Sequence, residues 1–184
     1  METARAGRIV LVRHGETEAN IRRCFADSDD TPLTDAGRLQ SRELAFRLSR
    51  EFCPEVLVSS HFLRARETCE IIGRVLGLPT EAIPGLHERD FGSLKGQPYE
   101  RLEEAPDCES LDAVRRRAMA AIEALRVRYP RREIVIVTHG AVIQAICGAA
   151  SVPPNCGIVT IDNATDNVGR GFGPAADLPV GADH

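Results

Sequence analysis

Two stretches of the chain share one pattern, and each ends in a histidine that could take part in chemistry. Residues 9–15 and residues 134–140 both consist of four apolar residues, one polar residue and a His-Gly pair. Continuous apolar runs of this kind are typical of strands buried on both faces of a parallel sheet. In such sheets, ligands bind just beyond the carboxyl ends of the strands. The pattern therefore predicts that His14 and His139 lie at one functional edge, where Gly15 and Gly140 allow sharp turns.

Arg13 adds an anion-binding group beside the first histidine. Its planar guanidinium can bind an anion through two parallel hydrogen bonds. The helical sequence after residues 13–17 also brings backbone N–H groups near a bound anion. A single histidine at a strand end commonly bonds to backbone groups only. Two histidines at matching positions of two similar segments, one of them beside an arginine, favour a functional site. A histidine nucleophile next to an anion-binding group is thus the chemistry that the first segment indicates.

Composition limits the partners and the number of domains. The chain has 184 residues, of which 43% are hydrophobic, enough for one domain with a real core. Its 23 basic and 27 acidic residues give a net charge of −4, which argues against nucleic acid and membrane surfaces as partners. Only one of the basic residues, Lys95, is a lysine. Codon bias explains most of the arginines, and binding of planar anions explains a few at most.

The cysteines and the apolar runs indicate where the protein resides. Six cysteines are scattered without a C-x-x-C pair, so neither a zinc site nor a redox motif is indicated. Their even number permits disulfides. Residues 1–8 do not resemble a signal segment, and no apolar run is long enough to cross a bilayer. We therefore expect a cytoplasmic protein with buried, reduced thiols.

The periodicity of the chain predicts a single α/β domain with a mostly parallel central sheet and helices on both faces. Strands are expected at residues 9–12, 56–58, 134–137 and 158–161. Helices are expected at residues 35–50, 62–76 and 141–149, and between Ser110 and Pro130. In the first helix, Leu39, Leu44 and Leu48 are expected to form part of the apolar face.

Two regions lack this periodicity. Residues 97–109 carry two prolines and five acidic residues, and they are expected to form a surface excursion. Residues 163–184 are rich in Gly, Ala, Pro and Asp, which predicts a loosely ordered tail after a domain spanning residues 1–162.

The segment Arg13-His14-Gly15-Glu16-Thr17, with Asn20 three residues on, resembles the signature of the histidine phosphatase superfamily, in its phosphoglycerate mutase-like branch with a small cap. Further similar segments follow in order: residues 31–34 with Gly37 and Gln40, residues 59–68, residues 86–92 and residues 137–140. Together they cover residues 9–161. Five ordered motifs identify the chain as a member of that family far more specifically than one motif does.

The resemblance implies a fold, a reaction and a set of site residues. The implied catalytic residues are His14 as nucleophile, Glu88 as proton donor and His139 as the second active-site histidine. The implied substrate-binding residues are Arg13, Arg64, Asn20, Thr17 and Gly15. The substrate is a small phosphate ester, and neither a metal nor another cofactor is implied.

Elementary chemistry agrees with these roles. A phosphomonoester carries about two negative charges, so its transfer needs positioned cations such as Arg13 and Arg64. A neutral His14 can form a phosphohistidine, which splits one difficult displacement into two easier ones. His139 would stabilise the transferring oxygens, most usefully if protonated. Glu88 would protonate the leaving oxygen and then activate water.

Several residues near these motifs have plainer interpretations. Without the family pattern, Glu88 is better explained as a solvated loop carboxylate than as a catalytic group. Arg66 lies two residues from Arg64, so the two cannot easily face one point of a helix, and Arg66 is expected at the surface. His61 and His87 either line the mouth of the site or are incidental. Residues 115–117 and 131–132, all arginine, are expected to be solvated. The internal histidines lack a zinc spacing such as H-x-x-x-H.

The chain departs from the family at positions that affect specificity. Leu94-Lys95-Gly96 stands where many members have an aromatic-acidic-Gly triplet, and the excursion is short. The leading hypothesis is a metal-independent phosphomonoesterase acting on small phosphorylated metabolites. A phosphoglycerate mutase ranks second because it needs a longer enclosing cap. A non-catalytic phosphate-binding module ranks last. The physiological ester is not specified, and a homodimer is left open.

Overall fold

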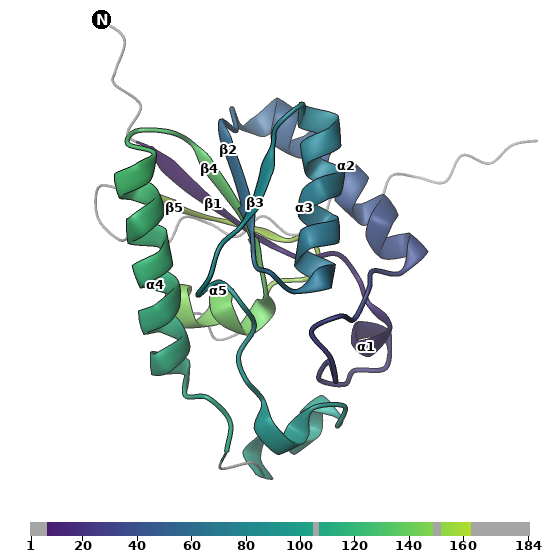
Figure 1. The fold of residues 1–184 in the computed structure, drawn as a ribbon. Helices are drawn as coiled ribbons and strands as arrows, with labels where there is room; N and C mark the ends of the chain where they lie inside the picture. Colours follow the sequence, from purple (N-terminus) through teal and green to yellow (C-terminus); the bar gives the residue numbers. More distant parts are fainter. Residues whose placement is uncertain (1–6, 105–106, 149–151, 163–184) are drawn as a thin grey trace, which may run out of the picture.

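The computed structural model describes residues 7–104, 107–148 and 152–162 of the chain. Its strands are β1 (Arg8–Arg13), β2 (Val56–Ser59), β3 (Thr80–Ala82), β4 (Ile134–Thr138) and β5 (Ile158–Asp162). They form one sheet in the order β3-β2-β4-β1-β5 (Figure 1). The first four are parallel, and β5 runs antiparallel to β1 at one edge. The expectation of a mostly parallel sheet is confirmed, while the predicted tail, residues 163–184, lies outside the described residues.

Strand β3 is a strand that the periodicity did not predict. Its residues Thr80, Glu81 and Ala82 are all exposed, so no apolar pattern announces it. The strand exists because its backbone pairs in parallel with β2 at the edge of the sheet.

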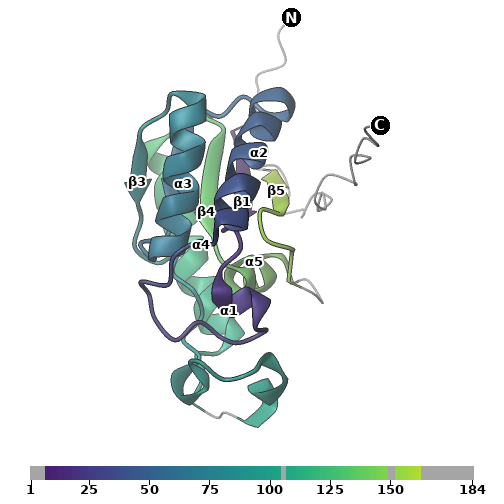
Figure 2. The same ribbon diagram turned by 90° about the vertical axis from the view of Figure 1, so that its right-hand side faces the viewer.

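Helices cover both faces of the sheet, as expected. Helices α2 (Asp35–Glu51) and α3 (Leu63–Leu76) lie on one face, and α4 (Leu111–Arg128) and α5 (Gly140–Cys147) lie on the other (Figures 1 and 2). The hydroxyl oxygens of Thr34 and Ser110 cap α2 and α4 by accepting N–H bonds from Gly37 and Ala113. Gly77 ends α3 in the left-handed conformation, with φ of 67°. A short helix, α1 (Glu18–Ile21), follows the first strand.

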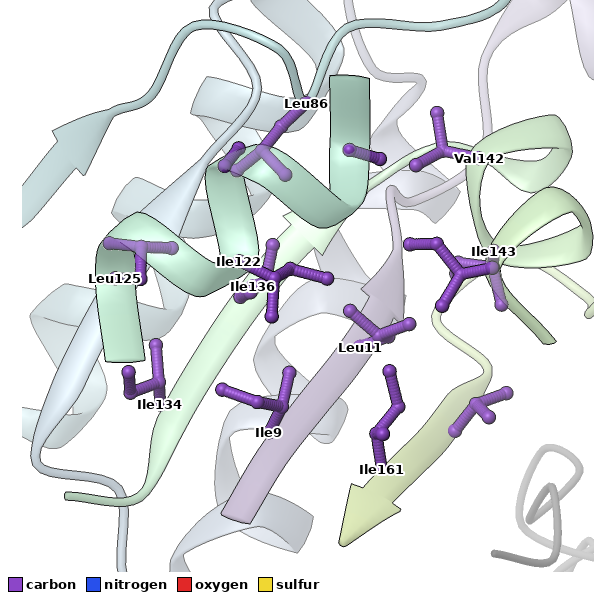
Figure 3. Close-up of a cluster of buried hydrophobic side chains, with 14 of the residues drawn as sticks. Ile9, Leu11, Leu86, Ile122, Leu125, Ile134, Ile136, Val142, Ile143 and Ile161 are labelled. Carbon is purple, nitrogen blue, oxygen red and sulfur yellow. The ribbon is translucent and has the colours of Figure 1, made fainter. Parts of the chain in front are cut away.

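The continuous apolar runs of the strands supply both halves of the core. Ile9 and Leu11 of β1 pack toward α4 and α5, in one cluster with Ile122 and Ile143 (Figure 3). The intervening residues of β1, including Val10, pack toward α2 and α3. Full burial of each such side chain contributes about 1.5–3 kcal/mol. Two-sided burial therefore explains why these strands show no polar alternation.

Leu39 does not lie on the apolar face of α2, contrary to the sequence prediction. It is 56% exposed, whereas Leu44 and Leu48 are buried. Leu39 and Leu48 are nine residues apart, which at about 100° per residue places them on opposite sides of the helix. The thiols also depart from expectation, since all six cysteines are free but only Cys69 is fully buried.

The excursion at residues 97–109 is anchored to the segment that follows α1. It contains the 3-10 helix η2 (Tyr99–Glu104), preceded by η1 (Gly92–Leu94). The Tyr99 N–H donates to the Arg23 carbonyl over 2.9 Å, and Phe25 donates its N–H to the Gln97 carbonyl over 2.9 Å. The ring of Phe25 lies 5.0 Å from that of Tyr99. These contacts fix a short cap beyond the carboxyl end of the sheet (Figure 2).

Candidate active site

The two histidines of the repeated pattern lie together at the carboxyl edge of the sheet. Strands β1 and β4 are parallel neighbours, and Arg13 is paired with Thr138 in their register. The His14 N–H continues this pairing by donating to the Thr138 carbonyl over 3.0 Å. The ring centroids of His14 and His139 are consequently 5.3 Å apart. Register between adjacent strands is thus what brings two residues 125 positions apart into one site.

His14 is buried in a form suited to nucleophilic attack. Its Nδ1 lies 2.7 Å from the Gly15 carbonyl oxygen. Because a carbonyl can only accept, Nδ1 carries the ring proton and Nε2 keeps a free lone pair. Burial lowers the pKa of His14 well below its usual value, and the charges of Arg64 and Arg13 lower it further. The imidazole is therefore neutral at neutral pH.

His139 is held by a serine on the neighbouring strand end. Its Nε2 lies 2.8 Å from Ser60 Oγ, and that oxygen already accepts the Phe62 N–H over 3.3 Å. The Ser60 hydroxyl can donate to Nε2, and we expect this arrangement, which leaves the ring proton on Nδ1. Within the described part of the chain, this buried Nδ1 has no hydrogen-bond partner.

The surroundings of His139 oppose the expectation that it works as a cation. Burial lowers its pKa well below the usual value, and the charge of Arg64 and the nearby ring of His14 add to this effect. In the free site, His139 is therefore neutral, and in the expected tautomer it is a donor through Nδ1. A bound phosphate dianion would favour its protonation.

Arg64 and Arg13 bring two guanidinium groups to the same cavity. Arg64 stands in the first turn of α3 and is only 3% exposed, with its charge 5.1 Å from the Phe62 ring. Its Nη1 donates to the Ser28 carbonyl over 3.4 Å. Arg13 donates from Nη1 to the Pro153 carbonyl over 2.7 Å, while its buried Nε has no partner among the residues described. Arg66 is exposed, as predicted.

Glu88 faces the same cavity as the arginines and is partly buried. Its Oε1 accepts the N–H of Arg89 over 2.9 Å. Burial raises the pKa of the Glu88 carboxyl, against the opposing effects of Arg64 and the Arg89 N–H. This environment does not fit a freely solvated loop carboxylate. It fits a carboxyl group that can hold a proton.

Three further residues expected to bind substrate differ in their placement. Thr17 and Asn20 line the cavity, where the Thr17 N–H donates to Asn20 Oδ1 over 3.1 Å. Gly15 is not among the cavity-lining residues. Its N–H donates to Thr68 Oγ1 over 3.0 Å, and its carbonyl holds His14. A Cβ on Gly15 would lie 2.6 Å from the Gly37 carbonyl oxygen, so the close approach that this glycine permits is to α2.

The sequence did not single out several residues that complete the site. Ser60 lies inside the motif at residues 59–68, but the sequence does not predict its bond to His139. Asn155 donates from Nδ2 to the His14 carbonyl over 3.0 Å and to Asn20 Oδ1 over 3.1 Å. Tyr99 of the cap accepts from Asn20 Nδ2 over 3.2 Å. No periodicity or spacing marks Asn155 or Tyr99, because only the tertiary fold brings them to the site.

Arg117 corrects the expectation that residues 115–117 are simply solvated. Its guanidinium is partly buried and donates to the carbonyls of Gly85, His87 and Glu88. Arg115 and Arg116 are exposed, as expected, although Arg115 also donates to the carbonyls of Ala145 and Ile146 near the end of α5. The helical spacing of three successive arginines could not show which of them faces the loop.

The site opens into a cavity of about 700 Å³ beyond the carboxyl ends of the strands. Apart from Arg13, His14, Arg64 and Glu88, its wall includes the aromatic residues Phe25, Phe62, Phe91 and Tyr99. His61 and His87 also line it, with ring centroids 5.6 Å apart. In the described ranges, no group of three or more His, Cys, Asp or Glu side chains is arranged to hold a metal ion. None of the helices described is both long and apolar enough to cross a membrane.

Comparison with known proteins agrees with this geometry. The model of the histidine phosphatase superfamily (branch 1) matches residues 9–167. An uncharacterized phosphatase, PhoE, of Bacillus subtilis (strain 168) is 35% identical over 144 residues, which cover 75% of this chain and 74% of that protein. Phosphoglycerate mutase-like protein 4 of Arabidopsis thaliana is 33% identical over 183 residues, covering 89% of this chain and 79% of that protein.

A solved structure extends the likeness to the whole fold. A mycobacterial glucosyl-3-phosphoglycerate phosphatase in complex with VO3 superposes with a TM-score of 0.74 at 25% identity, covering 84% of this chain and 90% of that chain. The family match spans nearly all of the domain, and it contains both histidine segments. The chain belongs to the histidine phosphatase superfamily, branch 1, and with it to a family of enzymes.

Proposed function

We propose that this chain is a metal-independent phosphomonoesterase that hydrolyses small phosphorylated metabolites through a phosphohistidine on His14. One observation carries the proposal. The Nε2 lone pair of a neutral, buried His14 shares a cavity with the guanidinium groups of Arg13 and Arg64 and with the carboxyl of Glu88. Nucleophile, charge-stabilising groups and proton donor are the parts that phosphoryl transfer to and from a side chain requires.

The donors without protein partners support binding of a phosphoryl group. Arg13 Nε and His139 Nδ1 are buried and unpaired among the described residues. An unsatisfied buried donor costs about 1–3 kcal/mol, which an accepting ligand oxygen removes. Phosphoryl oxygens are strong acceptors, and guanidinium groups bind them with particular strength. The site is thus best satisfied by an oxyanion with several acceptor oxygens.

The reaction then proceeds in two balanced steps. In the first, His14 Nε2 forms a bond to phosphorus, the ester P–O bond breaks, and Glu88 gives its proton to the leaving oxygen. In the second, the Glu88 carboxylate takes a proton from a water molecule while the oxygen of that water attacks phosphorus. The P–N bond breaks, and phosphate leaves. The raised pKa of Glu88 supports its role as proton donor in the first step. His14 returns to its neutral form at the end.

The charges of the arginines support the metal-independent part of the proposal. Arg13 and Arg64 supply the positive charge that a metal ion supplies in many phosphoryl-transfer enzymes. We expect turnover to persist in EDTA. Loss of activity on chelation, with recovery on adding Mg²⁺ or Zn²⁺, would overturn this part.

The cavity supports an ester whose organic part is larger than a few atoms. Its volume lies in the range of sites that enclose metabolite-sized ligands. The aromatic side chains of Phe25, Phe91 and Tyr99 offer flat surfaces against which such a group can pack. A panel of sugar phosphates, phosphorylated acids, nucleotides and phosphoamino acids, ranked by kcat/KM, would identify the preferred class.

A phosphoglycerate mutase is the second candidate, and the name of the Arabidopsis relative favours it. A mutase must keep its bisphosphate intermediate away from water. The cap of this chain is a short segment around η2, which favours hydrolysis. Efficient interconversion of 2- and 3-phosphoglycerate, faster than phosphate release, would reverse this ranking.

The phosphoenzyme itself gives the decisive experiment. The enzyme is mixed with a ³²P-labelled ester and denatured within milliseconds. We expect label on the protein that is stable to alkali and lost in acid, as a P–N bond requires. His14→Ala should carry no label and show no turnover, while circular dichroism shows a folded protein. Turnover by His14→Ala would contradict the proposal, and tight phosphate binding without any label would favour the non-catalytic module.

A further inference from the structure

We propose that Arg117 is a positioning residue that holds the Glu88 carboxyl in place for proton transfer. The inference rests on the proposed function, because it assigns Glu88 the role of proton donor. It concerns a residue of α4 that lines no part of the cavity.

The segment that carries Glu88 has no helix or strand of its own, and side chains satisfy its backbone. Arg117 donates from Nη1 to the carbonyls of Gly85 (2.8 Å) and His87 (2.7 Å). Its Nη2 donates to the Glu88 carbonyl over 3.0 Å. Thr138 Oγ1 donates to the remaining carbonyl, that of Leu86, over 2.8 Å. The four consecutive carbonyls of residues 85–88 are therefore bound by two side chains.

Arg117 is itself fixed by a carboxylate. Its Nε and Nη2 donate to Glu109 Oε1 and Oε2, each over 2.8 Å. With the three bonds to the loop, five hydrogen bonds match the five N–H groups of the guanidinium. The side chains of Arg117 and Glu109 are only 18% and 20% exposed, so water screens this pair less than a surface ion pair. Because every N–H of the Arg117 guanidinium is bonded and Glu109 fixes its position, the loop of residues 85–88 has little freedom to shift.

The backbone of Glu109 also bonds to the two residues that follow Glu88. Its backbone carbonyl accepts from Arg89 Nε over 2.6 Å, and its N–H donates to the Asp90 carbonyl over 2.8 Å. The N–H of Arg89 is the group that binds Glu88 Oε1. The Arg117–Glu109 pair thus holds the backbone on both sides of the Glu88 side chain.

The loop also touches α4 closely, at a position where only glycine fits. Gly85 has a φ of +87°, and a Cβ there would lie 3.0 Å from the Arg117 carbonyl oxygen. Thr138, which binds Leu86, directly precedes His139. The proton donor is therefore fixed relative to the two histidines through β4 and relative to the domain through α4.

Position matters more for Glu88 than for most loop residues. A general acid must lie within hydrogen-bond reach of the leaving oxygen, and misplacement by about 1 Å can cost roughly 100-fold in rate. Lysine keeps the charge of Arg117 but cannot bind three carbonyls and a carboxylate in one plane. The geometry consequently assigns Arg117 an effect on proton transfer that its charge alone does not supply.

The test uses two esters that differ in their need for a proton donor. Alkyl phosphates have a poor leaving group and need the acid, whereas p-nitrophenolate leaves readily without it. We expect Arg117→Gln and Arg117→Lys to lower kcat/KM about 10- to 100-fold for an alkyl phosphate and less than about 3-fold for p-nitrophenyl phosphate. Arg116→Gln, a change at the exposed neighbour on the same helix, should leave both values unchanged.

A double variant shows whether the effect passes through Glu88. With Glu88→Gln already in place, Arg117→Gln should cause no further loss with the alkyl ester, because the two residues act as one unit. Equal losses with both esters, or an additional loss in the Glu88→Gln background, would overturn the inference. If Arg117→Gln does not fold, Arg117→Lys and Glu109→Gln carry the same comparison.

The outcomes separate this inference from the proposed function. A wild-type enzyme that cleaves no ester would contradict the proposed function. A wild-type enzyme that depends on Glu88 but tolerates all changes at Arg117 would contradict the inference alone.

Discussion

Arg13 and Thr138 are paired in register across the parallel strands β1 and β4, each one residue before a histidine of the candidate site. This pairing gives His14 and His139 equivalent positions at the carboxyl edge of the sheet. It also lets Thr138 serve both sides of the site, since its carbonyl accepts the His14 N–H and its hydroxyl binds the Leu86 carbonyl. The sheet register therefore fixes His14, His139 and the loop that carries Glu88 together.

Arg64 and Arg66 provide a matched pair for testing phosphate binding. Arg64→Lys should lower kcat/KM roughly 10- to 150-fold, because a hydrogen bond to a charged group contributes about 1.5–3 kcal/mol and lysine cannot reproduce the fork. Arg66→Lys, on the exposed side of the same helix, should behave like the wild type. Steady-state kinetics and inhibition by inorganic phosphate measure both variants. Equal effects at the two positions would show that Arg64 does not contact the phosphoryl group.

Gly15 is expected to be essential for packing behind His14. In Gly15→Ala, the new Cβ would meet the Gly37 carbonyl oxygen at 2.6 Å, and neither backbone can move without disturbing α2 or His14. We expect a loss of about 1–3 kcal/mol in the free energy of unfolding, together with a large loss of kcat. Gly77→Ala is the control. Its φ of 67° costs about 1–2 kcal/mol, but nothing lies near its Cβ and the site is distant.

Urea unfolding and turnover distinguish the two glycine variants. Both should unfold at lower urea concentration, and only Gly15→Ala should lose activity beyond what its folded fraction explains. Full activity in folded Gly15→Ala would show that the contact with α2 does not hold His14 in place.

The sequence predicted the strands and histidines of this site better than its supporting contacts. Ile9 and Ile134 begin runs buried on both faces, and such runs are recognisable without knowledge of their neighbours. By contrast, Thr80–Ala82 forms β3 only because the edge of β2 is available for pairing. Asn155 bonds to His14, 141 positions away in the sequence, and Arg117 bonds to Gly85, 32 positions away. Such contacts leave no local sequence pattern. Long-range hydrogen bonds of this kind are set by the tertiary fold.

Ser60 is expected to set the tautomer of His139. In Ser60→Ala, the buried Nε2 loses its partner, and leaving it unsatisfied should cost about 1–3 kcal/mol of stability. The ring can then carry its proton on either nitrogen, so the donor at Nδ1 is no longer assured. We expect kcat/KM to fall roughly 5- to 10-fold. Imidazole ¹⁵N chemical shifts should show protonated Nδ1 in the wild type and a mixture of tautomers in the variant, and an unchanged tautomer would contradict this role.

The pH dependence of kcat/KM should report His14 and Glu88. His14 must be neutral to attack, so activity falls as the pH drops through its pKa. That limb lies well below the usual histidine value of about 6.5, because burial, Arg64 and Arg13 all lower the pKa. Glu88 must be protonated to donate, so activity falls as the pH rises through its pKa. Burial raises that pKa, which extends activity above the usual range of a carboxyl group.

Arg64→Gln tests both assignments at once, because the Arg64 charge lowers the pKa of both groups. Its removal should raise the pKa of His14 and that of Glu88, so both limbs of the profile should move to higher pH. The ionisation of the ester is the same for both enzymes and cancels in the comparison. Glu88→Gln should remove the alkaline limb while leaving the acid limb in place. Limbs that stay fixed in Arg64→Gln, or that move in opposite directions, would show that other groups control the profile, since one lost positive charge can only make protons bind more tightly at both sites.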